Sequence, residues 1–145
     1  MYRHIMIPTD GSDLSNAAVR HGVQLAREMN ARVTVVTVSP AFRTFTAEPF
    51  MATCTPDEYR RECASHAQRY LELAAAPAKA AGVPCETLHL ECDHPFEAII
   101  DTAAERGCDL IVMASHGRKG VAALVLGSET NKVLTHSKIP VLVCR

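Results

Sequence analysis

Tryptophan is absent from the chain, and aromatic residues of all kinds make up only 5% of it. Proteins that hold single-stranded nucleic acid stack its bases on aromatic side chains, so this composition argues against that function. Positive charge is not in excess either, because the formal net charge at pH 7 is -1 and the charged residues are dispersed. Without a basic field to attract phosphate polymers or acidic lipids, we expect neither nucleic acid nor a membrane as a partner.

Long apolar runs are also missing. No stretch approaches the roughly 20 apolar residues of a membrane-spanning helix, and the opening MYRHIMIPTD lacks the apolar core of a secretory signal. We therefore expect a cytoplasmic protein. Its six cysteines include no C-x-x-C pair, and we expect them to be reduced rather than joined in a disulfide framework. A chain of 145 residues, 48% of them hydrophobic, fits one domain over residues 1–145.

Familiar catalytic motifs are missing as well. The sequence has no glycine-rich run ending in Gly-Lys-Ser or Gly-Lys-Thr, and no G-x-S-x-G nucleophile elbow. The HIGH and SGGxDS motifs of nucleotidyl-transfer folds are absent too. No histidine or glutamate is visibly placed as a base beside a nucleophile, so we expect a binding protein rather than an enzyme.

What is present begins with a strand and a helix. Residues 3–7 form a short apolar strand that stops at Pro8, which cannot donate to a sheet ladder. Ser12 is a suitable N-cap for a helix that runs to about Met29, and Asn30 suits a left-handed position at its end. The helix is expected to bury one face, made of Leu14, Ala17, Ala18, His21, Leu25 and Met29.

A second strand and a long connection follow. Residues 32–38 are almost all β-branched, as expected of a parallel strand buried on both faces. Residues 39–55 form an irregular connection that is longer than most loops of compact domains, and we interpret it as either a lid or a partly mobile flap. Its phenylalanines are expected to tuck under the loop: Phe42, Phe45 and Phe50.

The next helix has a strong start, because Thr55 suits the N-cap, Pro56 the first position and Glu58 the capping box. We expect a kink or interruption near Pro77 and an end at residues 82–84. The face expected to point inward consists of Tyr59, Cys63, Ala67, Tyr70 and Ala74.

Residues 85–91 alternate between apolar and polar side chains, which is typical of a strand at the edge of a sheet. Just there the chain groups four potential metal ligands: His89, Cys92, Asp93 and His94. Their spacing is too tight and irregular for structural zinc, and a turn before a helix explains them better, so we expect no metal. That helix covers about residues 96–106, closes at Gly107, and turns inward Ile99, Ile100 and Ala103.

Residues 109–128, DLIVMASHGRKGVAALVLGS, carry the most informative pattern. An apolar strand over residues 110–113 breaks into the small turn ASHG, and nine residues separate Gly117 from Gly127-Ser128, where another helix begins. Unpaired backbone N–H groups at a helix start and the helix dipole favour an anion, and glycine lets that anion approach the backbone closely. The stretch therefore predicts a phosphate site.

Strands and helices alternate along the chain, which predicts an α/β fold with a doubly wound five-stranded parallel sheet and helices on both faces. Such sheets bind ligands at the carboxyl ends of their strands, where Asp10 would meet the turn at residues 114–117. Asp10 then either binds the ligand or caps the turn before its helix. Ser115 either touches the ligand or caps its turn, and Arg118 and Lys119 either contact phosphate or form a solvated turn.

The order of IMIPTDGS, MASHG, LGS and the final PVLVCR resembles the universal stress protein family over nearly the whole chain. The resemblance implies a Rossmann-like sheet of order 3-2-1-4-5 that binds ATP or, alternatively, AMP, with Mg²⁺ as a companion ion. It also implies a homodimer, paired through the apolar C-terminal strand of residues 139–143, with contacts at Pro140, Val141, Leu142 and Val143. Pairing would cover an edge that otherwise promotes aggregation.

The same resemblance implies a set of ligand contacts. Asp10 would bind the ribose or an adenine edge, and Val38 would lie against the adenine. ATP-binding members have glycine where this sequence has Ala114, so the site gains one methyl group. The full implied set is Pro8, Thr9, Asp10, Val38, Met113, Ala114, His116, Gly117, Arg118, Gly127, Ser128, Glu129 and Thr130.

Three functions remain open on these residues. The first is a nucleotide-binding stress protein that acts as a dimeric sensor or regulator, which Gly117 and the pair Gly127-Ser128 favour. The second is a dimeric interaction protein of the same fold with an empty site, which Ala114 favours. The third is a small enzyme acting on a nucleotide, for which no catalytic constellation is visible. Slow ATP hydrolysis or self-phosphorylation would be incidental to the first.

Overall fold

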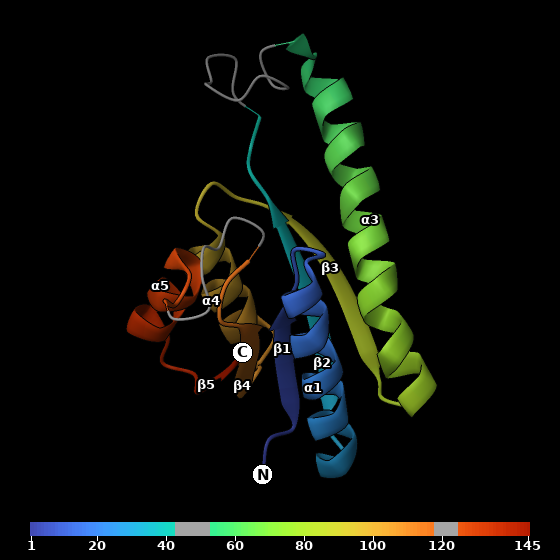
Figure 1. Cartoon of the computed structure of the whole chain (residues 1–145), viewed down its shortest axis with the longest axis vertical. Coiled ribbons are helices and arrows are strands. Elements are labelled where there is room, and N and C mark those ends of the chain that lie inside the picture. Colours follow the sequence, from blue (N-terminus) through green and yellow to red (C-terminus); the bar gives the residue numbers. More distant parts are fainter. Residues whose placement is uncertain (43–52, 118–124) are drawn as a thin grey trace.

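The computed structural model describes residues 1–42, 53–117 and 125–145. Along the chain the elements are β1 (His4–Pro8), α1 (Asp13–Met29), β2 (Arg32–Ser39), α3 (Pro56–Ala81), β3 (Cys85–Glu91), α4 (Pro95–Glu105), β4 (Leu110–Ala114), α5 (Ser128–His136) and β5 (Val141–Cys144). The strands form one sheet in the order β3-β2-β1-β4-β5, and every neighbouring pair is parallel. The predicted fold class and strand order are confirmed (Figure 1).

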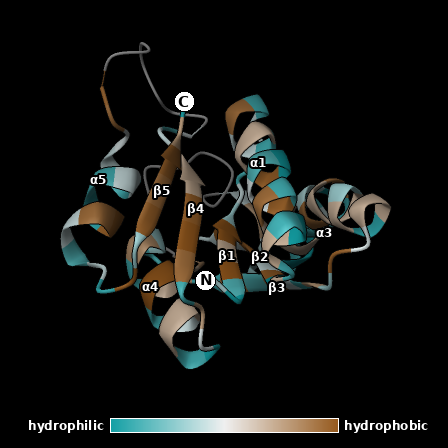
Figure 2. Cartoon of the chain, turned by 90° about the horizontal axis from the view of Figure 1, so that it is seen from below, coloured by the Kyte–Doolittle hydropathy of each residue, from teal (hydrophilic) through white to brown (hydrophobic). Residues whose placement is uncertain are grey.

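The helices cover both faces of the sheet (Figure 2). Side chains of α1 and α3 pack on one face in a core cluster that includes Ile5, Val19 and Leu71. Side chains of α4 and α5 pack on the other face in a second cluster that includes Met6, Ile99 and Val133. Strands β1 and β4 carry apolar side chains on both faces of the sheet. Their sequences are therefore nearly continuous hydrophobic runs.

Local signals placed most helix ends correctly. The Ser12 side chain caps α1 by accepting a hydrogen bond from the Ser15 N–H, and Asn30 is left-handed at φ 54°. Thr55 and Glu58 form the predicted capping box at the start of α3. Gly82 ends that helix with φ 69°.

Two helix predictions were only partly right. The buried face of α1 consists of Ser15, Ala18, Val19, Gly22, Val23 and Ala26, whereas His21 is exposed. This face is rotated from the expected one because small residues let α1 lie close to the sheet.

Helix α3 runs without interruption through Pro77. Ala74 and Ala78 are buried against the sheet on either side, and Leu73, whose carbonyl loses a donor, is exposed to water.

The last strand begins later than predicted. It covers Val141–Cys144, and Pro140 lies before it, with its carbonyl accepting a hydrogen bond from the Ile111 N–H at 2.9 Å. Proline lacks the N–H that a ladder position requires, which explains the later start.

All six cysteines are free thiols. None of the helices in the described ranges is long and apolar enough to span a bilayer.

Candidate functional site

The carboxyl end of β1 leads into a tightly bonded turn. The Thr9 N–H donates to the Val36 carbonyl at 2.8 Å, which continues the pairing with β2 by one residue. The Thr9 hydroxyl lies 3.1 Å from the Ser15 hydroxyl and accepts from the Gly11 N–H at 3.2 Å. Thr9 is therefore buried, and its side chain serves the turn rather than facing outward.

Asp10 caps the same turn. Its Oδ1 accepts a hydrogen bond from the Ser12 N–H at 3.0 Å. Gly11 between them has φ +76°, a left-handed conformation that side chains disfavour. The predicted capping role of Asp10 is thus confirmed for Oδ1. Oδ2 takes no part in this hydrogen bond.

The second oxygen of Asp10 lies against the turn that follows β4. A Cβ added to Gly117 would overlap Oδ2 of Asp10, so a side chain at residue 117 would have to displace that carboxylate. Residues that are far apart in the sequence thus meet at the carboxyl ends of β1 and β4, which are neighbours in the sheet. This is the predicted meeting of Asp10 with the glycine turn, and it lies at the point where the strand order reverses.

The turn after β4 is fastened on both sides. The Ser115 N–H donates to the Cys144 carbonyl of β5, and the Gly127 N–H donates to the Ser115 carbonyl, each at 2.7 Å. The Thr130 hydroxyl, buried in the first turn of α5, donates to the Ala114 carbonyl at 2.9 Å. The start of α5 is therefore held directly against the turn at residues 114–117.

Gly127 is needed for this close approach, because its added Cβ would lie 3.0 Å from Cα of His116. Gly127 is also the N-cap of α5, and no side chain of the described residues accepts a hydrogen bond there. Among the described residues the backbone N–H groups of this first turn have no side-chain cap, and the positive end of the helix dipole lies beside Ser115 and His116, next to Gly117. Both features suit a phosphate.

The other predicted contacts fall into three groups. Exposed or half-exposed at this edge are His116, whose Nδ1 lies 3.2 Å from the Ser115 hydroxyl, and Ser128 at the start of α5. Val38 and Met113 pack in the cluster beneath α4 and α5, and Pro8 is half-buried at the end of β1. Arg118 and most of the 39–55 connection lie outside the described residues, as do Phe45 and Phe50.

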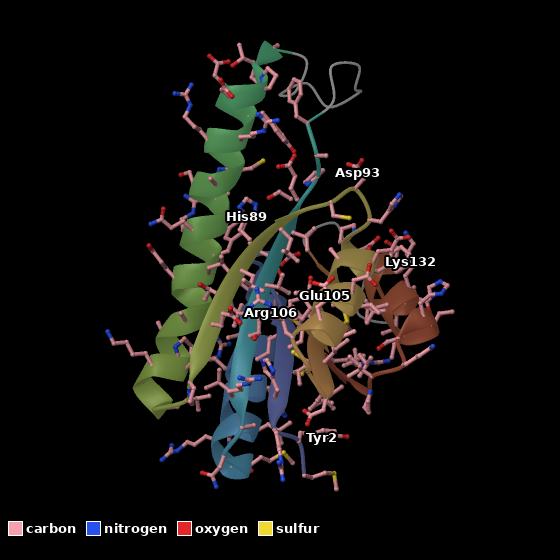
Figure 3. The ribbon with its side chains drawn as sticks, turned by 180° about the vertical axis from the view of Figure 1, so that it is seen from behind. Tyr2, His89, Asp93, Glu105, Arg106 and Lys132 are labelled. Atoms are coloured by element: carbon pink, nitrogen blue, oxygen red, sulfur yellow. The ribbon has the colours of Figure 1, made fainter. Side chains whose placement is uncertain are left out.

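Glu129 has a structural partner instead of a free carboxylate. Its Oε2 accepts from the Phe96 N–H at the start of α4 at 3.0 Å, and its Oε1 pairs with Lys132 at 3.2 Å (Figure 3). The sequence did not reveal this role, since it depends on how α4 and α5 pack. The same holds for the Ser15 hydroxyl and for Tyr70 of α3, whose ring lies on Gly11.

The four potential metal ligands near β3 have other roles. His89 Nε2 lies 2.8 Å from the Ser39 hydroxyl, and Asp93 accepts from the Ala41 N–H at 3.2 Å (Figure 3). Cys92 and His94 bond to each other within their turn, where Cys92 Sγ accepts from the His94 N–H. These bonds fit the predicted turn.

One hollow of the described surface lies elsewhere. It has a volume of about 470 Å³ and lies between α3 and β3, and a second of about 220 Å³ adjoins it near the end of β2. Neither is lined by residues of the turns after β1 and β4. The residues common to both hollows are Ala64 and His89.

Comparison with known proteins identifies the fold's relatives. Universal stress protein YxiE of Bacillus subtilis is 32% identical over 149 residues, with both chains covered in full. Universal stress protein MJ0531 of Methanocaldococcus jannaschii is 33% identical over 150 residues, covering all of this chain and 83% of that protein.

Solved structures agree. The structure of hypothetical protein MJ0577 superposes with a TM-score of 0.83 at 26% identity, covering 99% of this chain and 96% of that one. A universal stress protein in complex with cAMP superposes with a TM-score of 0.74 at 28% identity, covering 99% and 97%. The model of the universal stress protein family matches residues 1–145. With the sheet order, the paired turns and these relatives in agreement, the chain belongs to the universal stress protein family.

Proposed function

We propose that this protein binds an adenine nucleotide where β1 and β4 end, and that it acts in the cytoplasm as a homodimeric sensor or regulator of a stress response. The observation that carries the proposal is the contact of Asp10 with Gly117, beside the start of α5, which lacks a side-chain cap. The relative in complex with cAMP supports an adenine nucleotide as the ligand class.

Different residues would contact different parts of the nucleotide. The backbone N–H groups of Gly117 and Ser128 would bind the phosphates, because an anion there gains both N–H donors and the helix dipole. Gly127, whose own N–H donates to the Ser115 carbonyl, would let the phosphates approach its backbone closely. Asp10 would accept hydrogen bonds from the ribose or the adenine edge, and Val38 would contact the ring. ATP is the proposed ligand and AMP the alternative.

Mg²⁺ would enter with ATP. Glu129 already accepts the Phe96 N–H and pairs with Lys132, so its carboxylate would contribute little to an ion at α5. Magnesium commonly keeps several waters and takes phosphate oxygens, which suits a site that supplies backbone donors rather than an acidic cage.

Ala114 is compatible with this proposal. The residue is 8% exposed, so the protein covers most of its surface, including the added methyl. Its carbonyl is held by Thr130 whatever the side chain is. The alternative, a dimeric interaction protein of the same fold with an empty site, rests on this one substitution.

The first experiment is to purify the protein without added nucleotide, denature it, and identify any released nucleotide by chromatography and mass. Near-stoichiometric adenine nucleotide is the expected result. If none is released, a melting experiment with Mg-ATP decides, since ligand at about 100 times its dissociation constant stabilises by roughly 2.7 kcal/mol. Mg-CTP is the matched control, and the absence of any shift with ATP, AMP or cAMP would exclude the nucleotide and favour the alternative.

We also propose that the protein is not an enzyme. A turnover assay with Mg-ATP should give a rate near the uncatalysed background even at saturating nucleotide. Hydrolysis at several turnovers per second, in the range of ordinary enzymes, would contradict this.

A further inference from the structure

Tyr70 of α3 lies directly on the turn that carries Asp10. A Cβ added to Gly11 would overlap the Cδ1 and Cε1 atoms of the Tyr70 ring. The ring therefore occupies the space where every residue other than glycine would place a side chain. A residue in the middle of a helix thus touches the backbone of the turn after β1.

The turn needs such a support. Gly11 is left-handed at φ +76°, and glycine has more conformational freedom than any other residue, so its backbone must be held by its surroundings. Asp10 precedes it, and the Ser12 N–H that donates to Asp10 follows it. Whatever fixes Gly11 therefore fixes the direction of the Asp10 carboxylate.

Tyr70 is placed differently from the core residues of α3. It is only half-buried and does not belong to the core cluster that contains Leu71, Ala74 and Ala78. Its ring neighbours are polar: the His66 ring lies 6.2 Å away, and the Arg69 guanidinium lies 5.9 Å from the ring centroid. A tyrosine in this position adds little to the core, yet it covers a single flexible glycine.

We propose that Tyr70 is a positioning residue for the nucleotide site. Its ring holds Gly11, Gly11 sets the Asp10 carboxylate, and Asp10 lies against Gly117, so one line of contacts joins α3 to both turns of the site. The proposal rests on the proposed function for its effect on binding, but its structural part can be measured without any nucleotide.

The test begins with the ligand-free protein. Hydrogen exchange by NMR reports the Ser12 amide, which is bonded to Asp10 Oδ1. In Tyr70→Ala we expect this amide to exchange about tenfold faster, the change given by about 1.4 kcal/mol of local stability. In Tyr70→Phe the exchange should stay at the wild-type rate, because the atoms that touch Gly11 belong to the ring and not to the hydroxyl.

Leu71→Ala is the matched control on the same helix. Leu71 packs in the core cluster, so its truncation should lower the melting temperature but leave the Ser12 amide and the nucleotide affinity unchanged. Tyr70→Ala should show the opposite pattern, with a small change in melting temperature and an affinity for Mg-ATP lowered about tenfold through lost preorganisation.

Each outcome decides. Unchanged Ser12 exchange in Tyr70→Ala overturns the proposal, and so does an equal increase in Leu71→Ala, which would mean that any loss of stability opens the turn. Faster exchange with wild-type affinity would also overturn it as a statement about the site. If wild-type protein binds neither Mg-ATP nor AMP, the proposed function fails. The effect of Tyr70 on the position of Asp10 is then decided by the exchange rates of the Ser12 amide alone.

Discussion

Asp10 and Gly117 are in contact through the second carboxylate oxygen of Asp10, and a Cβ at residue 117 would have to displace that oxygen. This explains a glycine at position 117 in two ways at once. A ligand could approach the backbone there, and the carboxylate of Asp10 already does. The glycine thus keeps the Asp10 carboxylate in its place even before any nucleotide is considered.

Gly117→Ala should therefore move the Asp10 carboxylate out of place. We expect the affinity for Mg-ATP to fall about tenfold or more, since a misplaced contact group loses preorganised binding. Isothermal titration calorimetry measures the affinity directly. Gly82→Ala is the control. Gly82 has φ +69°, so a side chain there is strained, but its added Cβ meets open space, and Gly82 ends α3 rather than lying in the proposed site. Equal affinities for Gly117→Ala and wild type would remove residue 117 from the site.

Thr130→Val tests the fastening of α5 to the turn. Valine keeps the shape but removes the hydroxyl that donates to the Ala114 carbonyl at 2.9 Å. We expect urea unfolding to show a loss of about 1 kcal/mol, the usual net value of such a bond. Thr135→Val is the matched control on the same helix, since its hydroxyl also bonds a backbone carbonyl but is exposed. The control should change stability by less than about 0.5 kcal/mol, and equal losses in both would contradict the special role of Thr130.

Leu142→Asp tests the proposed homodimer. Val141 packs against the cluster beneath α4 and α5, whereas Leu142 is 38% exposed on the edge strand. A charge at Leu142 should block strand pairing without entering the core, and light scattering should report monomers. Leu73→Asp places the same charge on a leucine of α3 that is 57% exposed and far from β5. A Leu142→Asp protein that keeps its dimer would exclude pairing through β5.

His4 should make stability depend on pH. The neutral ring fits its site, because Nδ1 lies 3.1 Å from the Arg106 carbonyl, to which it must donate, and Nε2 lies 2.7 Å from the Thr34 hydroxyl. Burial, and then the positive charge of Arg32, lower the pKa of His4 below its ordinary value of 6.5, although the hydrogen bond to the Arg106 carbonyl and the charges of Asp109 and Glu86 oppose this. The unfolded chain therefore takes up a proton at a higher pH than the folded chain does.

The stability contributed by His4 is accordingly complete above its ordinary pKa of 6.5 and is lost as the pH falls through the lowered pKa. Urea unfolding at about pH 8 and about pH 5 measures the difference, and His4→Gln should show less of it. Asp109, whose pKa is lowered by the Arg3 and His4 N–H groups against the opposing effect of burial, titrates below this window. Identical pH slopes in both proteins would rule out His4 as the cause.

Much of the fold could be predicted because its signals are local. The cap at Ser12, the capping box at Thr55 and the left-handed Asn30 each depend on a few consecutive residues, and all three are confirmed. The apolar run at residues 110–113 predicted a strand, and β4 is buried along its whole length. The alternation of these elements predicted a parallel sheet, and the family resemblance implied the order of its strands.

The remaining features depend on contacts between distant segments. The rotated face of α1 could not be read from hydrophobicity, because Gly22 and Ser15 are buried there while Leu25 is only half-buried. Glu129 resembles a phosphate-site residue in sequence but bonds the start of α4. Tyr70 looked like one more inward position of its helix, and nothing in the sequence indicates that its ring covers Gly11.

The strand order also has a consequence for how the protein folds. Strand β1 pairs on one side with β2, which follows it closely, but on the other side with β4, where the partner of Ile5 is Leu110, far along the chain. During synthesis the half containing β1, β2 and β3 can therefore assemble while one edge of β1 is still open. Closing that edge requires a long loop, which slows folding. A nascent chain halted before β4 should thus be the form most in need of a chaperone.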